Sequence, residues 1–198
     1  MAGRAKYAHR AVLALGSNLG ESEDTLERAV ADLVAGGVQL VRASGLYRTA
    51  PVGGPAGQPD FVNAVIEVTT DLGAYELLKL CNAVEAAHHR ERLVRWGPRT
   101  LDIDVIDYDG VISEDPVLTL PHPRAQERAF VLVPWAQMDP QAYLTVTRRA
   151  EPSGERPDEV PEPLSREVVN VAELSRTVVE ADEDAISYMR EMQVPDQP

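Results

Sequence analysis

Two aspartates, Asp102 and Asp104, stand two positions apart in an apolar segment that predicts a β-strand over residues 100–108. Side chains two apart on a strand point to one face, so both carboxylates would lie together while the intervening apolar residues enter the core. Magnesium takes one or two carboxylates and fills its other positions with water and substrate phosphates. The spacing therefore fits a metal-ATP site, although two solvated aspartates on an exposed sheet face would show the same pattern.

Arginines are concentrated around this acidic pair. Neighbouring carboxylates repel unless cations compensate them, and arginine binds phosphate oxygens through forked, charge-assisted hydrogen bonds. A phosphate chain held between a metal and arginines would suit both groups. Ordinary surface ion pairing is the alternative for any single arginine, and Arg95 is evenly balanced between the two. The cluster consists of Arg90, Arg92, Arg95, Arg99, Arg124 and Arg128.

Three further features could serve a nucleotide site, each with a structural alternative. Trp96 lies in a turn with Gly and Pro, where it can cover a flat heterocycle or plug the edge of the domain. His122, between two prolines, can bond a phosphate or make a structural hydrogen bond. The turn from Gly16 to Gly20 joins a strand to a helix, but it matches neither GxxxxGK[ST] nor GxGxxG, so it is a weak signal.

Composition excludes several classes of protein. The chain has 198 residues and a net charge of −13, and thirteen acidic against four basic residues fall in 150–198, so the rest is only mildly acidic. A nucleic-acid surface would need a wider basic excess. The single cysteine, Cys81, excludes an intrachain disulfide and predicts a buried, inert thiol. No apolar window is long enough to cross a membrane, so we expect an unexported, cytoplasmic protein.

Periodicity and turn residues predict the elements that position the acidic pair. Their order is typical of an α+β fold with a ferredoxin-like βαββαβ core, in which helices cover one face of an antiparallel sheet. The predicted elements are a strand at 11–15, a helix begun by Asp24 and Glu27 and ended at Gly36, an extended stretch at 38–48, a half-buried strand at 61–68, a helix from Asp71 to about His88, and the strand at 100–108.

The C-terminal part differs in composition from the rest. A short apolar strand is predicted at 130–133, and residues 150–163 are rich in Glu, Asp, Pro and Arg, which is typical of a linker. Apolar residues return between 164 and 192 and predict extra strands or a helix. We therefore expect a catalytic domain at 1–149 and an acidic extension at 150–198, partly disordered or packed on the domain.

Together these motifs resemble the 6-hydroxymethyl-7,8-dihydropterin pyrophosphokinase family. The matching segments occur in the family's order across residues 11–140, and the string RWGPRTLDID is highly specific, whereas LGSNL alone would not be. The segments are LGSNL at 15–19, YRTAP at 47–51, QPDFVNA at 58–64, RWGPRTLDID at 95–104 and LTLPH at 118–122, followed by Arg128 and Phe130.

The resemblance implies transfer of diphosphate from ATP to the hydroxymethyl group of the pterin, with release of AMP, in tetrahydrofolate biosynthesis. It also implies two magnesium ions bound by Asp102 and Asp104. ATP and the pterin would be the small-molecule partners, and we expect a monomer. The catalytic residues would be Arg90, Arg92, Arg99, Asp102 and Asp104. ATP would contact Arg90, Arg92, Trp96, Arg99, Thr119, His122 and Arg128. The pterin would contact Thr49, Ala50, Val52, Phe61, Asn63, Trp96 and Phe130.

The sequence departs from the family pattern at two places besides its acidic extension. His88 and His89 replace glycine or small residues before the loop arginines, and Val117 replaces an arginine found in some members, a contact that Arg124 would have to supply. Two other functions remain open at this point. A nucleotide-binding module would bind ATP without releasing AMP, and an interaction module would act through its acidic extension.

Overall fold

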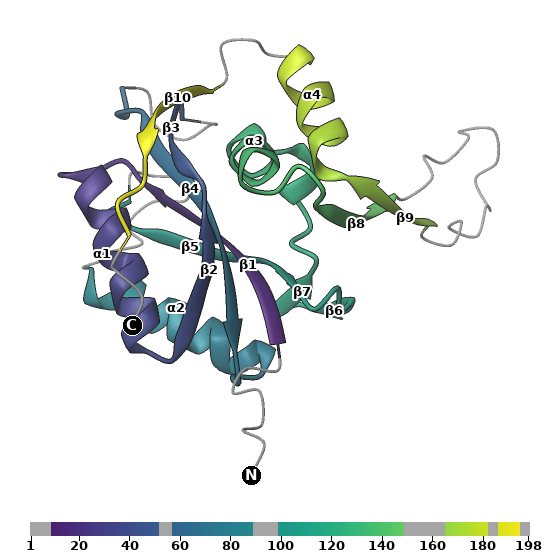
Figure 1. The fold of residues 1–198 in the computed structure, drawn as a ribbon, viewed down its shortest axis with the longest axis horizontal. Helices are drawn as coiled ribbons and strands as arrows, with labels where there is room; N and C mark the ends of the chain where they lie inside the picture. Colours follow the sequence, from purple (N-terminus) through teal and green to yellow (C-terminus); the bar gives the residue numbers. More distant parts are fainter. Residues whose placement is uncertain (1–8, 52–56, 89–98, 149–164, 182–185, 195–198) are drawn as a thin grey trace.

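The chain is described by a computed structural model that covers residues 9–51, 57–88, 99–148, 165–181 and 186–194. Helices surround a large antiparallel sheet, which confirms a mixed α and β structure (Figure 1). The ferredoxin-like arrangement of its core stays a prediction. Within the described ranges, no helix combines the length and the apolar character that a membrane span requires.

The sheet has the order β10-β3-β4-β1-β5, and β2 pairs with the far half of β4. Its centre is buried on both faces, so the expectation of a half-buried strand at 61–68 is wrong. Val65 and Glu67 lie on the face opposite Ala64 and Ile66, and a second layer covers them as well. The strands are β1 (His9–Ser17), β2 (Val38–Ala43), β3 (Gly45–Thr49), β4 (Phe61–Thr70), β5 (Asp102–Tyr108) and β10 (Ser187–Glu191).

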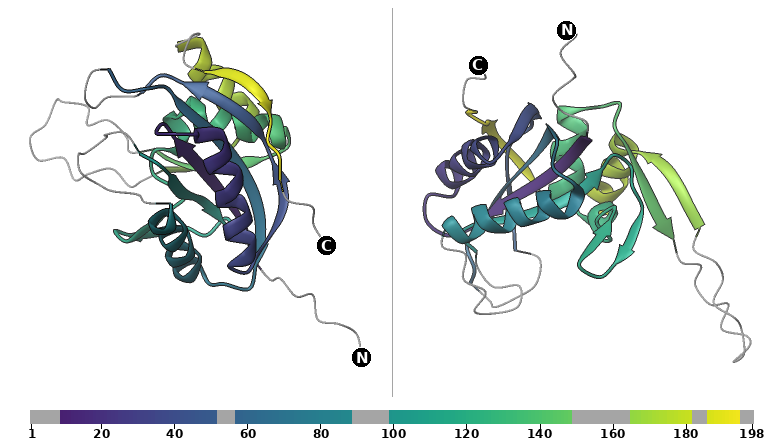
Figure 2. Two further views of the ribbon diagram at one scale, coloured as in Figure 1. Left: turned by 90° about the vertical axis from the view of Figure 1, so that its left-hand side faces the viewer. Right: turned by 90° about the horizontal axis from the view of Figure 1, so that it is seen from below.

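Two helices, α1 (Ser22–Ala35) and α2 (Ala74–Ala87), cover one face of the sheet, as Figures 1 and 2 show. Each presents an apolar stripe to the strands, the pattern that predicted both helices. The core on this face includes Leu13, Leu15, Leu26, Leu33, Ile66, Leu77, Cys81 and Ile103.

The predicted starts of these helices need correction. The first begins at Ser22, so Asp24 and Glu27 lie inside it instead of capping it. The second begins after Gly73, whose N–H donates to Glu76 Oε2 at 2.9 Å, and Asp71 lies outside. In the second helix the cap is therefore made by a carboxylate from the first turn that reaches back to the chain before it.

The opposite face is covered by α3 (Ala129–Met138). Helix α4 (Val171–Ala181) packs on α3, with the pair of β8 (Tyr143–Arg148) and β9 (Ser165–Asn170) beside them (Figure 2). Helices on both faces contradict the expected one-sided cover. The core on this side includes Val12, Ala14, Val65, Ile106, Val131, Leu132, Trp135 and Leu144.

The strand predicted at 130–133 is wrong, since these residues form the start of α3. The run AFVLVPWAQM is apolar almost throughout, and such a run does not distinguish a buried strand from a buried helix. Val131, Leu132 and Trp135 are fully buried at helical spacing. Packing against the sheet therefore decides the helix, even with Pro134 inside it.

Part of the acidic extension packs on the domain. Strand β10 pairs with β3, and Arg190 in β10 contacts Glu23 and Glu27 of α1, each at 2.7 Å. Met192 is buried in the core. Residues 150–163, predicted as a linker, lie outside the described ranges, and the division at residue 149 stays a prediction.

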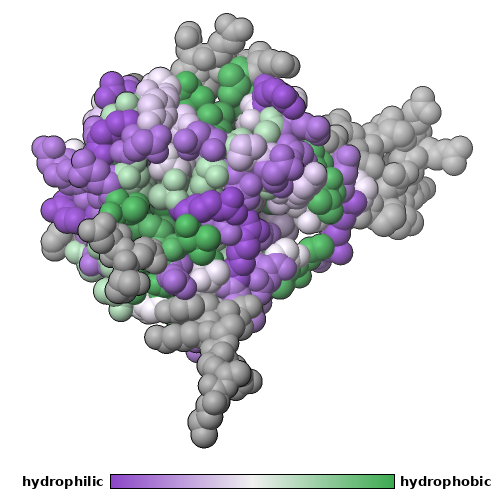
Figure 3. Space-filling model, viewed as in Figure 1, coloured by the Kyte–Doolittle hydropathy of each residue, from purple (hydrophilic) through white to green (hydrophobic). Residues whose placement is uncertain are grey.

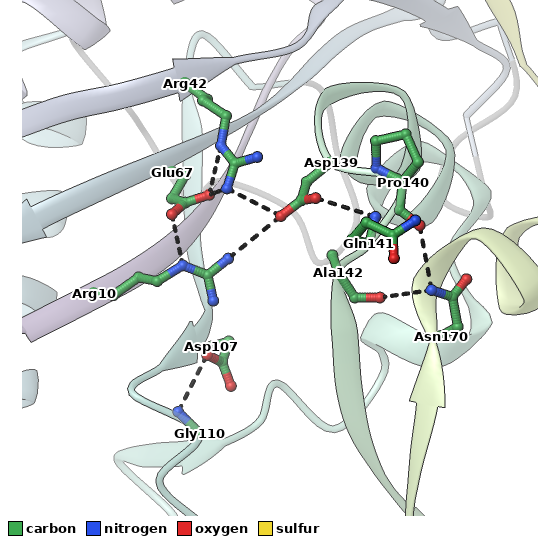
Figure 4. Close-up of polar contacts among 10 residues, drawn as sticks. All are labelled: Arg10, Arg42, Glu67, Asp107, Gly110, Asp139, Pro140, Gln141, Ala142 and Asn170. Atoms are coloured by element: carbon green, nitrogen blue, oxygen red, sulfur yellow. Dashed lines mark hydrogen bonds and ion pairs between the residues drawn. The ribbon is translucent and has the colours of Figure 1, made fainter.

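A charge network joins the sheet to the end of α3 (Figure 4). Glu67 is buried and contacts Arg10 at 2.6 Å and Arg42 at 2.8 Å, and Arg42 also reaches Asp139 at 3.0 Å. The contact between Arg10 and Glu67 is a hydrogen bond from the arginine to the carboxylate, and it raises the pKa of this arginine. The network lies toward the start of β1, whereas the aspartate pair lies beside its end.

Short elements follow β5: β6 (Ser113–Asp115) pairs with β7 (Leu118–Leu120), and a 3-10 turn, η1 (Ala125–Glu127), leads into α3. These elements bring residues 118–128 back beside β5, since β7 packs on it.

On the face shown in Figure 3, hydrophilic and hydrophobic residues are interspersed.

Candidate active site

The register of the central strands places a predicted pterin-binding residue and a predicted metal ligand in one row across the sheet. Gly16 of β1 pairs with Asn63 of β4 on one side and with Asp102 of β5 on the other. Directly paired residues share a face, and neighbouring strands lie about 4.8 Å apart, so the two side chains stand on one face about 10 Å from each other. Glycine leaves the position between them without a side chain.

The same register brings the second aspartate into place. Asp104 pairs with Ala14, two residues before Gly16 in β1, so it stands on the same face as Asp102. Leu101, Ile103 and Val105 are buried, as the alternation predicted. The two carboxylates are therefore both presented to the site, and both are partly exposed.

Each aspartate has a cationic neighbour. Arg99 forms an ion pair with Asp102, and Arg128 Nη1 lies 3.2 Å from Asp104 Oδ2. His122 Nε2 lies 3.8 Å from the same oxygen, beyond hydrogen-bond distance. These contacts compensate two carboxylates that would otherwise repel each other.

The carboxylates at this site are of the kind and number that bind magnesium together with the phosphates of a substrate. Among the residues that the structure describes, no three His, Cys, Asp or Glu side chains form a metal-binding group. Asp102 and Asp104 supply the one or two carboxylates that magnesium uses when phosphates and water complete its shell. The other ligands of a magnesium ion bound here would be water and the phosphates of a substrate.

His122 is held in a defined tautomer. Its backbone N–H donates to the Ile106 carbonyl at 2.8 Å, and its Nδ1 accepts from the Arg124 N–H at 3.2 Å, which leaves the proton of a neutral ring on Nε2. Burial lowers the pKa of His122, opposed in part by Asp104, so the neutral form is favoured. A neutral ring directs its Nε2 proton toward the carboxylate side of the site.

The predicted pterin residues lie on β3 and β4. Asn63 is buried, and its Nδ2 donates to Thr49 Oγ1 at 2.8 Å. Thr49 pairs with Phe61 across the two strands. Ala50, which follows β3, is exposed, and Val52 lies outside the described residues. The amide oxygen of Asn63 faces the space above Gly16, where an added Cβ would meet it at 3.1 Å.

Phe130 is the second residue of α3 and is partly buried against the core of that layer. The guanidinium of Arg128 lies 5.3 Å from the centre of its ring, within cation–π range. Since Arg128 also contacts Asp104, it connects a predicted pterin residue to the acidic pair.

The remaining predicted residues are placed less closely or not at all. The Thr119 hydroxyl donates to the Asp115 carbonyl within the β6–β7 pair, and Arg124 is exposed beside Glu127. Arg90, Arg92, Arg95 and Trp96 lie outside the described residues, so their predicted roles stay predictions.

Three residues of this region were not predicted as site residues. Gly16 and Asn18 belong to the LGSNL turn, which alone is a weak signal, and Arg99 exchanges two hydrogen bonds with Asn18. Glu85 of α2 is buried, and its Oε1 accepts from the Ile103 N–H, between the aspartates, at 2.7 Å. A carboxylate four residues after Cys81, on the apolar face of a helix, was the available signal.

Comparison with known proteins gives concordant results. Residues 12–140 match the family model described as 7,8-dihydro-6-hydroxymethylpterin-pyrophosphokinase. A 2-amino-4-hydroxy-6-hydroxymethyldihydropteridine pyrophosphokinase of Methylorubrum extorquens is 46% identical over 136 residues, which cover 68% of this chain and 85% of the relative. The Mycobacterium leprae protein of the same name is 42% identical over 178 residues, covering 84% of this chain and 90% of the relative.

The solved structures agree on the fold. A crystal structure of Plasmodium falciparum HPPK-DHPS with pteroate superposes with a TM-score of 0.58 at 13% identity, and the match covers 94% of this chain. This chain spans about half the length of that protein, since the match covers 49% of it.

Proposed function

Because this chain belongs to the 7,8-dihydro-6-hydroxymethylpterin-pyrophosphokinase family, we propose that it transfers the diphosphate of ATP to the hydroxymethyl group of 6-hydroxymethyl-7,8-dihydropterin. AMP is the second product, and the reaction belongs to tetrahydrofolate biosynthesis. The roles of particular residues rest on one observation: Asn63, Gly16 and Asp102 lie in one row across three strands. This row sets an amide for a heterocycle and a carboxylate for metal-ATP on one face, and the glycine at the strand position between them carries no side chain.

The donor half is formed around β5. Asp102 and Asp104 would hold magnesium, which when bound neutralises phosphate charge and polarises the group to be transferred. Arg99 and Arg128, now paired with these carboxylates, would turn to the phosphate oxygens as the metal replaces them. His122 in its neutral form would donate its Nε2 proton to a phosphate oxygen. Arg90, Arg92, Trp96 and Thr119 complete the predicted nucleotide contacts.

The acceptor half is formed by β3, β4 and the start of α3. Asn63 can offer both an amide donor and an acceptor to the polar edge of a pterin, and Thr49 holds its orientation. Phe61 and Phe130 would lie on the two faces of the ring. Thr49, Ala50 and Val52 would supply backbone contacts, and Trp96 would cover the site.

The reaction is an in-line attack by the pterin hydroxymethyl oxygen on the β-phosphorus of ATP. The bond between the β-phosphorus and the oxygen that bridges it to the α-phosphate breaks, and AMP leaves with that oxygen. The attacking hydroxyl gives up its proton to water as its oxygen bonds to the β-phosphorus. Arginines stabilise the charge that develops on the transferring group, and the row across β4, β1 and β5 aligns the two substrates. The described site therefore needs no nucleophilic side chain.

Five finer expectations belong to this proposal. Two magnesium ions, a monomeric state and a cytoplasmic location stay predictions. A ferredoxin-like core and a catalytic unit at 1–149 are proposed in the same way, supported by the β1-α1-β2-β3-β4-α2-β5 order.

One assay tests the function. The protein is incubated with ATP, magnesium and 6-hydroxymethyl-7,8-dihydropterin, and we expect AMP to form together with the pterin diphosphate. Asp102→Asn and Asp104→Asn should each lower kcat by about 100-fold or more, because each removes a carboxylate that would hold the magnesium neutralising the transferred group. Asp71→Asn is the matched control, since Asp71 is exposed near the other end of β4. Formation of ADP, or full activity without both aspartates, would refute the assignment.

A further inference from the structure

We propose that Asn18 is a positioning residue that holds the donor half of the site in register with the acceptor half. The inference rests on the proposed function, because it concerns the alignment of two substrates. Asn18 follows the end of β1 directly and is 3% exposed. It belongs to the LGSNL segment, which has no role in the metal binding or the pterin binding proposed above.

The hydrogen bonds of Asn18 reach two segments that are distant in sequence. Its backbone N–H donates to the Arg99 carbonyl at 3.0 Å, and its Oδ1 accepts from the Arg99 N–H at 2.7 Å. Its Nδ2 donates to the Pro59 carbonyl at 3.1 Å. One amide side chain thus joins the segment before β5 to the segment before β4.

Both segments lead directly into the two halves of the site. Arg99 lies three residues before Asp102 and forms an ion pair with its carboxylate. Pro59 lies two residues before Phe61, where β4 begins. Since a displacement of about 1 Å at reacting groups can lower the rate about 100-fold, a link between these segments is well placed to control alignment.

A purely local role does not account for these contacts. The strand-to-helix turn has its own side-chain bond, from Ser17 Oγ to Ser22 Oγ at 3.0 Å. The bonds of Asn18 described above leave the turn for Arg99 and Pro59. We therefore expect its loss to change catalysis by more than its effect on stability explains.

Asn170 provides a matched control for Asn18 (Figure 4). Its Nδ2 donates to the carbonyls of Pro140 and Ala142, and its Oδ1 accepts from the N–H groups of Ala172 and Glu173. It is a comparable amide link between backbone segments, located where the pair of β8 and β9 meets α4. Asn18→Ala and Asn170→Ala should each lower Tm by about 2–8 °C.

The experiment measures kcat, and separately the Kd of each substrate partner. The probes are α,β-methylene-ATP with magnesium, which cannot be cleaved at the reacting bond, and 6-hydroxymethylpterin. We expect Asn18→Ala to lower kcat about 100-fold while each Kd changes by less than about threefold. Asn170→Ala should keep kcat within about twofold. A kcat that is equally unaffected in both variants, or a loss explained entirely by weaker binding of one substrate, would overturn the proposal.

A second variant covers the case in which Asn18→Ala does not fold. Asn18→Asp keeps the shape and the acceptor for Arg99, but it loses the donor to Pro59, so kcat should fall about tenfold or more. Wild-type kcat in this variant would overturn the proposal. Failure of the proposed function would show differently, because the unaltered protein would then form no AMP.

Discussion

Gly16→Ala tests whether the space between Asn63 and Asp102 is where the pterin edge binds. Gly16 has strand geometry, so alanine is compatible with its backbone. An added Cβ would lie 3.1 Å from Asn63 Oδ1 and 3.9 Å from Phe61 Cδ1, and no atom of Asp102 lies among its contacts within 4 Å. The perturbation is therefore directed at the acceptor half alone.

The magnitude follows from these distances. The amide of Asn63 has to move by a few tenths of an ångström, against its bond to Thr49. Crowding costs about 1 kcal/mol, and the lower entropy of the unfolded chain offsets about 0.4–1 kcal/mol, so the free energy of unfolding should change little. Weakening one hydrogen bond to the pterin costs about 1–2 kcal/mol, or about 5–30-fold in Kd.

Calorimetric titration of 6-hydroxymethylpterin in the presence of magnesium and α,β-methylene-ATP measures this effect. The Kd of the ATP analogue should stay within about twofold, since Asp102 is not contacted. Gly73→Ala is the control: its added Cβ would lie 3.6 Å from Glu76 Oε2, an ordinary contact away from the site. Unchanged pterin affinity in Gly16→Ala would refute the assignment of this space to the pterin.

Three more predictions concern stability and reactivity. Glu67→Ala should lower the free energy of unfolding in urea by about 1.5–3 kcal/mol, because it removes a buried carboxylate that accepts charge-assisted hydrogen bonds from two partly exposed arginines. The exposed pair lost in Glu114→Ala should matter by less than about 0.5 kcal/mol, and equal effects would contradict this. Burial lowers the pKa of His122, so the unfolded chain takes up this proton first and stability should fall as pH drops below about 6.5. His122→Gln should lack that part of the decline, and parallel pH profiles would speak against it. Burial also raises the pKa of Cys81 to about 12, so an aromatic disulfide reagent at pH 8 should react only after unfolding; rapid reaction of the folded protein would argue against a buried thiol.

Local sequence patterns were sufficient to predict the features that depend on a single strand or helix. Alternation along β5 predicted that Leu101 and Ile103 are buried and that the aspartates share the other face, because the two-residue repeat is a property of the strand itself. The two helices α1 and α2 were predicted in the same way, from the spacing of apolar residues along one face of each helix. Their first residues were not, because capping depends on single hydrogen bonds at the helix ends.

The tertiary structure decided what depends on contacts between distant segments. An apolar run such as Phe130 to Val133 is compatible with either element, and burial against the sheet makes it a helix. The same layer buries the second face of β4, which the alternation had left open.

The aspartates, the amide and the motif order were present in the sequence by itself, and they determined the family and the kind of chemistry. Their arrangement as a site came from the strand register, in which Gly16 separates Asn63 from Asp102. The residues paired with Gly16 lie 47 and 86 positions further along the chain, and the alternation within one strand does not specify which residues of distant strands pair. The role that we propose for Asn18 became visible for the same reason, since its partners lie far along the chain.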